Sequence, residues 1–470
     1  MPFNSFNFWL IFPFIFMLFW AIPAKFKQGR KIYLLLISYL LYMNWKPSFA
    51  LILLGVTAIT YAGALVLEKK DQSRKNLGIL FTLLGILPLC VFKYYNFLND
   101  SLTDLMVSLH LNFSLPGLNW AIPVGISFFT FQAVGYMLDV FHKRIEAEHN
   151  FLDYMLFVSF FPQVTSGPIS KASELIPQIK ANHKFDYDQA RQGLKYLLWG
   201  MFLKLALADR LGLYVDTVVG NYEHISGANC LMASIFYSLQ IYGDFAGYSL
   251  ISIGIARTLG FNLINNFERP YFAISVTDFW RRWHISLSRW LKDYVYIPMG
   301  GSRCSKARNY WNIFITFLVS GIWHGANWTY ILWGCFHGIA QIIEKALGFQ
   351  KCNSKNFFVR AFRIILTFTI VNFAWIFFRM PTIGDANHFI SNMFSNFGNL
   401  DIMAVGTTNL ACIFIATCIL FVKDLRDELS IKWLNFLNRP LMRWSIYVIL
   451  FAFIISCGVL DSGQFIYVSF

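Results

Sequence analysis

Apolar segments long enough to cross a membrane recur along almost the whole chain of 470 residues. A spanning helix needs about 20 predominantly apolar residues. Segments of this kind lie at residues 5–22, 31–45, 47–67, 77–94, 121–141, 194–219, 230–256, 311–347 (a helix pair), 364–378, 409–422 and 444–460. Only 14% of the residues are charged, against about 25% in soluble domains, so charge is too scarce to cover a soluble surface. The sequence therefore predicts an all-α polytopic membrane protein of about 11–13 helices.

Basic residues predict how these helices are oriented. Lys and Arg outnumber Asp and Glu by 39 to 25, which gives a net charge of +14. Cytoplasmic loops of membrane proteins accumulate Lys and Arg, which explains this excess better than a nucleic-acid partner does, so no nucleic acid is expected. The rule assigns to the cytoplasm residues 25–31, 68–75, 281–308, 351–363 and 423–443. Residues 379–408 and the tail 461–470 then face outward.

Three further features of the sequence concern its first segment, its domain organisation and its cysteines. The first apolar segment has its basic cluster after it, the reverse of a secretory signal, so we expect a retained helix. There is neither a soluble domain nor an internal repeat, which predicts one transmembrane domain over residues 1–470. The eight cysteines form no Cys-x-x-Cys pair, so neither a metal site nor a disulfide framework is expected.

Two stretches depart from simple spanning helices. Residues 160–168 contain two prolines and a glycine, and such backbone is tolerated at membrane depth only where protein or a water-filled cavity surrounds it. They are either a re-entrant element or an ordinary surface loop. Residues 275–293 carry tryptophans at helical spacing among arginines, and Ser275 with Asp278 has capping-box spacing. This pattern predicts an interfacial amphipathic helix, whose one unusual member is His284.

Among the nine histidines, His284, His324 and His337 are the informative ones, because the others lie in polar loops or at a helix end. His324 follows the polar boundary near residues 309–310 by about 13 residues, which places it roughly 20 Å into the membrane. Ionisable groups at that depth indicate function, although a histidine hydrogen-bonded to a neighbouring helix is the structural alternative. A neutral histidine is well suited to act as a general base toward a hydroxyl.

The sequence lacks the motifs of several other enzyme classes. It contains no Gly-rich phosphate loop, no Gly-x-Ser-x-Gly elbow and no His-Glu-x-x-His pair. Acyl transfer that uses one or two histidines is the chemistry that remains.

Several long motifs resemble one known family. They are NFERPY at residues 266–271, DFWRRWH at 278–284, YIPMGG at 296–301 and WHG at 323–325, with similar runs at 123–139, 160–177, 198–210 and 240–260. Together they resemble the membrane-bound O-acyltransferase (MBOAT) family, most closely its alginate O-acetyltransferase (AlgI-like) branch. The chain departs from the family pattern at Gly243, where an aromatic residue is usual, and at Ala246, where serine is usual.

The resemblance implies a fold and a set of site residues. The family fold is a ring of helices around a thin core, where a cytoplasmic funnel meets a through-membrane tunnel, with re-entrant and interfacial helices. His324 matches the catalytic histidine and His284 the second signature position. The implied donor is a cytoplasmic thioester, acetyl-CoA, with no bound cofactor and no metal. Its candidate phosphate contacts are Arg281, Arg282 and Arg303, which the positive-inside rule would also place in the cytoplasm.

The outward tail resembles a motif proposed to carry acyl groups in related cell-envelope systems. Residues 465–470 have Phe-x-Tyr-x-x-Phe spacing, so Tyr467 would carry the acyl group. The alternative is an interfacial belt of aromatic residues. If Tyr467 carries the acyl group, the expected partners are an extracytoplasmic SGNH-hydrolase-like acetyltransferase and a polysaccharide acceptor.

These expectations combine into an O-acetyltransferase that makes several passes through the bacterial plasma (inner) membrane and serves an exported polysaccharide. The alternative within this class is D-alanyl transfer to teichoic acid, as in the DltB-like branch, with a carrier protein as donor. From another class, a transporter or lipid flippase would also use buried histidines and broken helices, and it predicts paired halves with matching interruptions.

Overall fold

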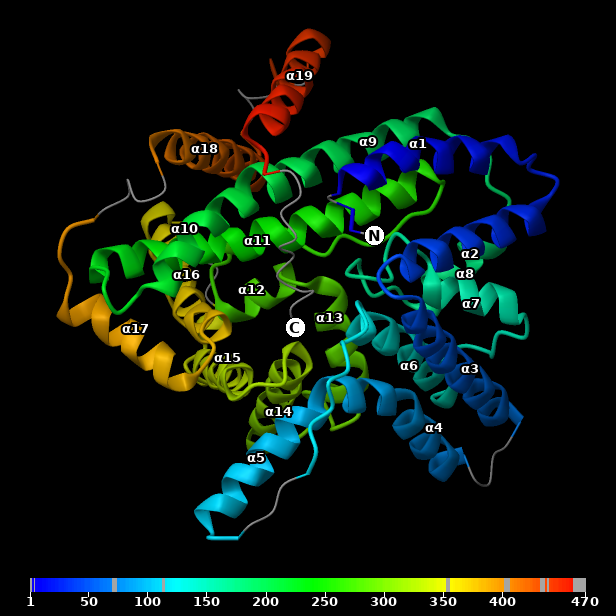
Figure 1. Ribbon diagram of the computed structural model, residues 1–470, viewed down its shortest axis with the longest axis horizontal. Coiled ribbons are helices and arrows are strands. Elements are labelled where there is room, and N and C mark those ends of the chain that lie inside the picture. Colours follow the sequence, from blue (N-terminus) through cyan, green and yellow to red (C-terminus); the bar gives the residue numbers. More distant parts are fainter. Residues whose placement is uncertain are drawn as a thin grey trace. The chain divides into compact units, whose positions relative to one another are not determined.

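The computed structural model describes residues 2–3, 5–69, 74–111, 115–351, 356–400, 406–431, 436–437 and 439–459. These residues form helices and connecting turns, with no strand among them, which confirms the predicted all-α fold (Figure 1). Backbone contacts divide the chain into two compact units. The first consists chiefly of residues 7–193 and 252–264, and the second of residues 194–251 and 265–470.

The first unit is built around α3. Its helices are α1 (Phe6–Ala21), α2 (Lys27–Met43), α3 (Pro47–Lys69), α4 (Arg74–Leu89), α5 (Tyr95–Ser108), α6 (Ile126–Phe141), α7 (Phe151–Ser159) and α8 (Ala172–Lys180). Helix α3 packs against α2, α4, α6 and α7. The sequence predicted a spanning segment over residues 77–94, but in the structure the helical segment extends over Arg74–Ser108. A π-helical turn at Cys90–Tyr94 joins α4 directly to α5.

The interrupted stretch 160–168 lies inside the first unit. Helix α7 stops at Ser159, and the turns that follow are almost entirely buried. The Gln163 amide donates to the carbonyl of Phe157 at 3.3 Å, and the Ser170 hydroxyl donates to Gln163 Oε1 at 2.8 Å. The prediction of an ordinary surface loop is therefore wrong, because this segment is buried. Polar side chains in the core provide hydrogen bonds where the helix is interrupted.

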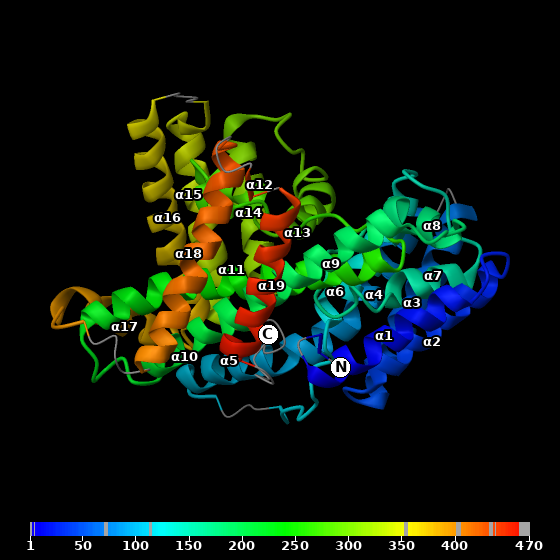
Figure 2. The same ribbon diagram turned by 90° about the horizontal axis from the view of Figure 1, so that it is seen from above.

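The second unit carries the signature motifs. Its helices are α10 (Asp209–Gly220), α12 (Val276–Arg282), α13 (Ile285–Leu291), α14 (Lys306–His324), α15 (Trp328–Ala346), α16 (Phe357–Arg379), α17 (Ile383–Ser395), α18 (Thr407–Leu429) and α19 (Pro440–Cys457). Helices α14 and α15 form a hairpin that packs against α16, and α12 contacts both α15 and α16 (Figure 2). Two further helices, α9 (Tyr187–Met201) and α11 (Gly227–Thr258), contribute residues to both units.

Five described helices are long and apolar enough to cross a membrane. They are Pro47–Lys69, Arg74–Ser108, Phe357–Arg379, Thr407–Leu429 and Pro440–Cys457. On α19, Leu441, Val448 and Ile455 are each more than half exposed. Apolar side chains that point out of the fold need a lipid environment rather than water, so the protein is located in a membrane.

Charge is also buried deep in the second unit. A π-helical segment, η2 (Phe202–Ala208), joins α9 to α10 and contacts both α18 and α19. Its Lys204 ammonium lies 2.7 Å from a carboxylate oxygen of Asp209 and 2.6 Å from one of Asp244 on α11. None of the three side chains is more than 4% exposed. Buried charges of this kind are tolerated only when they are paired.

Candidate active site

His284 lies where the predicted interfacial helix is broken in two. Helix α12 ends at Arg282 and α13 begins at Ile285, and His284 between them has φ 43° and ψ 55°. This left-handed conformation costs a non-glycine residue about 1–3 kcal/mol. His284 and its neighbour Trp283 are both fully buried. The prediction of a single interfacial amphipathic helix over residues 275–293 was therefore wrong, because the helix is broken at His284, which is buried in the core.

The start of α12 agrees with the sequence. Ser275 caps the helix, since its hydroxyl accepts a hydrogen bond from the Asp278 amide at 3.0 Å. A second cap comes from α15, where the buried Glu344 carboxylate accepts from the Thr277 amide at 3.0 Å. Helix α15 therefore fixes the N-terminus of α12. His284 follows the opposite end of this short helix.

Asn266 holds the strained turn at His284. Its backbone oxygen accepts from the Ile285 amide at 3.0 Å, and its side-chain oxygen accepts from the Ser286 amide, also at 3.0 Å. One step further out, the Glu268 amide donates to the Arg282 oxygen at 2.9 Å. The loop that carries the NFERPY motif thus bonds the backbone on both sides of His284 and compensates for its conformation.

His324 is the last residue of α14. Eighteen residues separate it from Lys306 at the start of that helix, a rise of about 27 Å. The side chain is only 2% exposed. Its ring centroid lies 5.0 Å from those of Trp323 and Trp333 and 5.2 Å from that of Phe378, with the rings edge to face. The sequence predicted that His324 follows the polar boundary near residues 309–310 by about 13 residues, and the structure places it at the end of α14 opposite Lys306.

The indole ring of Trp323 contacts both signature histidines, His284 and His324. The Trp323 ring lies 5.0 Å from the His324 ring and 5.8 Å from the His284 ring. The ring of Phe245, on α11, lies 4.6 Å from the His284 ring, edge to face. Burial lowers the pKa of His284 to about 3, so this imidazole is neutral at physiological pH. A neutral imidazole has one N–H donor and one acceptor nitrogen.

Two glycines beside His324 allow α14 and α15 to approach closely. A Cβ added at Gly321 would collide with the backbone oxygen of Tyr330, and one added at Gly325 would collide with the Tyr330 ring. The structure shows that α15 occupies the space beside both of them.

His337 joins the cluster from α15. It is fully buried, and its ring lies 4.8 Å from Trp333, which itself contacts His324. The indole N–H of Trp280 donates to His337 Nδ1 at 3.3 Å. Because an indole N–H can only donate, Nδ1 of His337 is the acceptor in this bond. The sequence singled out His337 among apolar residues but gave it no role in the predicted site.

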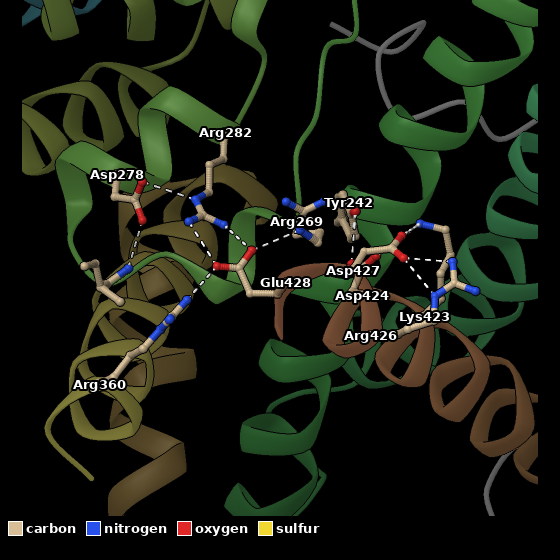
Figure 3. Close-up of polar contacts among 11 residues, drawn as sticks. Tyr242, Arg269, Asp278, Arg282, Arg360, Lys423, Asp424, Arg426, Asp427 and Glu428 are labelled. Atoms are coloured by element: carbon tan, nitrogen blue, oxygen red, sulfur yellow. Dashed lines mark hydrogen bonds and ion pairs between the residues drawn. The ribbon is translucent and has the colours of Figure 1, made fainter. Parts of the chain in front are cut away.

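A carboxylate and three arginines connect α12 to the helices around it (Figure 3). Glu428, near the end of α18, is 6% exposed. It accepts from Arg282 of α12 at 2.9 and 3.3 Å, from Arg269 of the NFERPY loop at 3.0 Å, and from Arg360 of α16 at 2.8 Å. Arg282 and Arg269 belong to the two backbone segments that hold His284. We call Glu428 and these three arginines the Glu428 cluster.

We expect Glu428→Gln to destabilise the protein by about 2 kcal/mol, because it leaves three guanidinium groups without their shared carboxylate. This corresponds to a melting temperature lower by roughly 5 °C, measured by thermal unfolding in detergent. The matched control is Asp427→Asn on the same turn. Its carboxylate is more exposed and pairs with Lys423 and Arg426, so its loss should cost at most about 1 kcal/mol. Equal stability of the two variants would contradict the importance of the cluster.

The remaining site candidates from the sequence are three arginines and one tyrosine. Arg281 is exposed on α12, and Arg303 is exposed in the turn before α14. Arg282 is held by the Glu428 cluster and by Asp278 at 3.2 Å. Tyr467 lies outside the described residues. In the part of the chain that the structure describes, no group of three or more His, Cys, Asp or Glu side chains could hold a metal ion.

Comparison with known proteins gives consistent matches. Residues 82–382 match the model of the MBOAT, membrane-bound O-acyltransferase family. The chain is 35% identical over 405 residues to "Probable alginate O-acetylase AlgI" of Pseudomonas aeruginosa, which covers 84% of this chain and 75% of the relative. It is 34% identical over 398 residues to "Peptidoglycan O-acetyltransferase" of Helicobacter pylori (79% and 75%). It is 28% identical over 291 residues to "Teichoic acid D-alanyltransferase" of Streptococcus thermophilus (59% and 66%).

Proposed function

Because the chain belongs to the membrane-bound O-acyltransferase family, we propose that it passes an acetyl group from cytoplasmic acetyl-CoA across the membrane for O-acetylation of an exported polysaccharide. Family membership makes the protein an O-acyltransferase, which favours an enzyme over the transporter or flippase considered from the sequence. Relatives named for the O-acetylation of alginate and of peptidoglycan support a polysaccharide acceptor.

His324 is the proposed general base. One of its ring nitrogens takes the proton of the acceptor hydroxyl while the hydroxyl oxygen bonds to the acetyl carbon. The carbon–sulfur bond of the thioester breaks, and the departing thiolate takes the proton back from His324. The observation that carries this proposal is the burial of His324 at the end of α14 among Trp323, Trp333 and Phe378. Imidazole is effective in this role because its ordinary pKa lies near neutral pH.

His284 is proposed to orient the substrate or to stabilise the developing charge. Its contact with the same indole as His324 and its neutral state support this role. Arg281, Arg282 and Arg303 are proposed contacts for the donor's phosphates. The exposure of Arg281 and Arg303 suits that task, whereas Arg282 would have to leave Glu428 to perform it. Acetyl-CoA is consumed as a substrate, so no bound cofactor is proposed.

The proposed location is the bacterial plasma (inner) membrane, with several passes. The five described helices of spanning length support it. An extracytoplasmic SGNH-hydrolase-like acetyltransferase is the proposed partner, and it would complete transfer to the polysaccharide.

Tyr467 is the proposed acyl carrier between the two proteins. Tyr467→Phe keeps the ring but removes the nucleophilic oxygen, so we expect polymer acetylation to fall at least about tenfold. Acetyl content of the secreted polymer is the measurement, and Tyr447→Phe on α19 is the control that should remain active. Normal acetylation by the Tyr467 variant would instead support the aromatic-belt interpretation.

A direct test distinguishes the two candidate donors. Purified membranes are given labelled acetyl-CoA or a D-alanyl carrier protein, and label in the acceptor is counted. We expect transfer from acetyl-CoA alone. Transfer from the charged carrier alone would replace the proposal by D-alanyl transfer, which the similarity to a teichoic acid D-alanyltransferase keeps as the second candidate.

A further inference from the structure

Two cysteines that are far apart in the sequence meet at one end of the second unit. Cys412 lies in the second turn of α18, and Cys457 is the last residue of α19. Their sulfur atoms are 2.9 Å apart. A disulfide bond requires about 2.05 Å between the sulfurs, so a small side-chain rotation brings this pair to bonding distance. The spacing of 45 residues gave no sign of it in the sequence.

Other contacts hold the two helix ends in place independently of the thiols. The Arg210 guanidinium, on α10, donates to the backbone oxygen of Cys457 and to the side-chain oxygen of Asn409. The Val459 amide donates to the Leu205 oxygen at 3.0 Å. Both helices also contact η2. The approach of the sulfurs therefore follows from the packing of several elements.

The thiol pair lies at the end of α18 and of α19 that is opposite the basic residues of these two helices. Glu428, which binds three arginines of other elements, lies 16 residues beyond Cys412 along α18, a rise of roughly 24 Å. Along α19, Arg443 lies 14 residues before Cys457, a rise of roughly 21 Å. Basic residues mark the cytoplasmic ends of spanning helices. The cysteines are then at the extracytoplasmic ends, where oxidising conditions allow disulfides to form and persist.

We propose that Cys412 and Cys457 form a disulfide bond on the extracytoplasmic side of the membrane. The two thiols lose two protons and two electrons, and the electrons reduce the disulfide of an extracytoplasmic thiol–disulfide oxidoreductase to a dithiol. Cys457 is the more exposed of the pair, so its thiolate attacks that disulfide first. The Cys412 thiolate then displaces the oxidoreductase from the mixed disulfide.

The bond would fix the C-terminal end of α19. It closes a loop between α18 and α19 and anchors α19 immediately before residues 460–470. A cross-link across such a loop stabilises the protein chiefly by restricting its unfolded chain. The proposal concerns the covalent state of the mature protein and holds whichever acyl group the enzyme transfers.

Alkylation of thiols tests the proposal directly. Cells are quenched with N-ethylmaleimide, and the purified protein is then labelled with a maleimide polymer before and after reduction. We expect two of the eight cysteines to accept the polymer only after reduction. Cys412→Ala and Cys457→Ala should each lose this reduction-dependent labelling, and Cys418→Ala on the same helix should keep it. Complete alkylation of the unreduced wild-type protein would overturn the proposal.

A second arm tests the side of the membrane and the effect on stability. Treating intact spheroplasts with a membrane-impermeant reductant and then an impermeant maleimide should label the pair; labelling only after permeabilisation would contradict the extracytoplasmic placement. Reduction should lower the melting temperature of the wild-type protein by roughly 5 °C or more. The same treatment should leave the Cys412→Ala variant unchanged. An equal shift in both proteins would rule out the bond as its cause.

Discussion

We expect His324→Ala to abolish acetyl transfer while the protein remains folded. A positioned general base contributes about 10²–10⁴-fold to a reaction rate, so we expect transfer from labelled acetyl-CoA to fall at least about a hundredfold. His284→Ala should lower the rate less, because the proposed role of that imidazole is orientation or charge stabilisation. The measurement is initial rate in purified membranes at saturating donor.

Two comparisons separate catalysis from structure in that experiment. His388, on α17, is exposed, and His388→Ala should keep full activity. His324→Gln keeps a polar side chain in the aromatic cluster but supplies no base, so it should be as inactive as the alanine variant while melting closer to the wild type. Activity of the glutamine variant within tenfold of the wild-type rate would refute general-base catalysis by His324.

Lys204→Met should destabilise the protein by about 3–5 kcal/mol. Methionine has a similar length, but it leaves the carboxylates of Asp209 and Asp244 buried without the cation that pairs with both. Removing one partner from a buried charge group has a penalty of this size. We expect a melting temperature lower by roughly 10 °C in detergent. Activity should fall as well, because Asp244 precedes Phe245, which packs on His284.

The controls for Lys204→Met compare an exposed ion pair with the buried one and remove the uncompensated buried charge. Lys423→Met removes a cation that is one-third exposed and 3.2 Å from Asp427, so its effect should be at most about 1 kcal/mol. Adding Asp209→Asn and Asp244→Asn to Lys204→Met removes the uncompensated charge and should recover much of the lost stability. If the single methionine variant melts with the wild type, the buried ion pairs are not important for stability.

The helices were largely predictable because a spanning segment is a local property. Apolar length, basic flanks and capping residues such as Ser275 are all read within about 20 neighbouring positions. The same local signals singled out His284, His324 and His337, since an imidazole surrounded by apolar residues stands out in any window. They failed at the turn around His284, where helical spacing continued without interruption while the bonds from Asn266 broke the helix.

The sequence by itself determined that this is a helical membrane protein with histidines buried in its apolar segments, because hydrophobic length and polarity act over single turns and single helices. Only the tertiary structure decided which side chains meet. The Glu428 cluster joins Glu428 to Arg282, 146 residues away, and the sulfurs of Cys412 and Cys457 meet across 45 residues. Periodicity identifies the buried face of a helix, but the partner on that face depends on how the helices pack against one another.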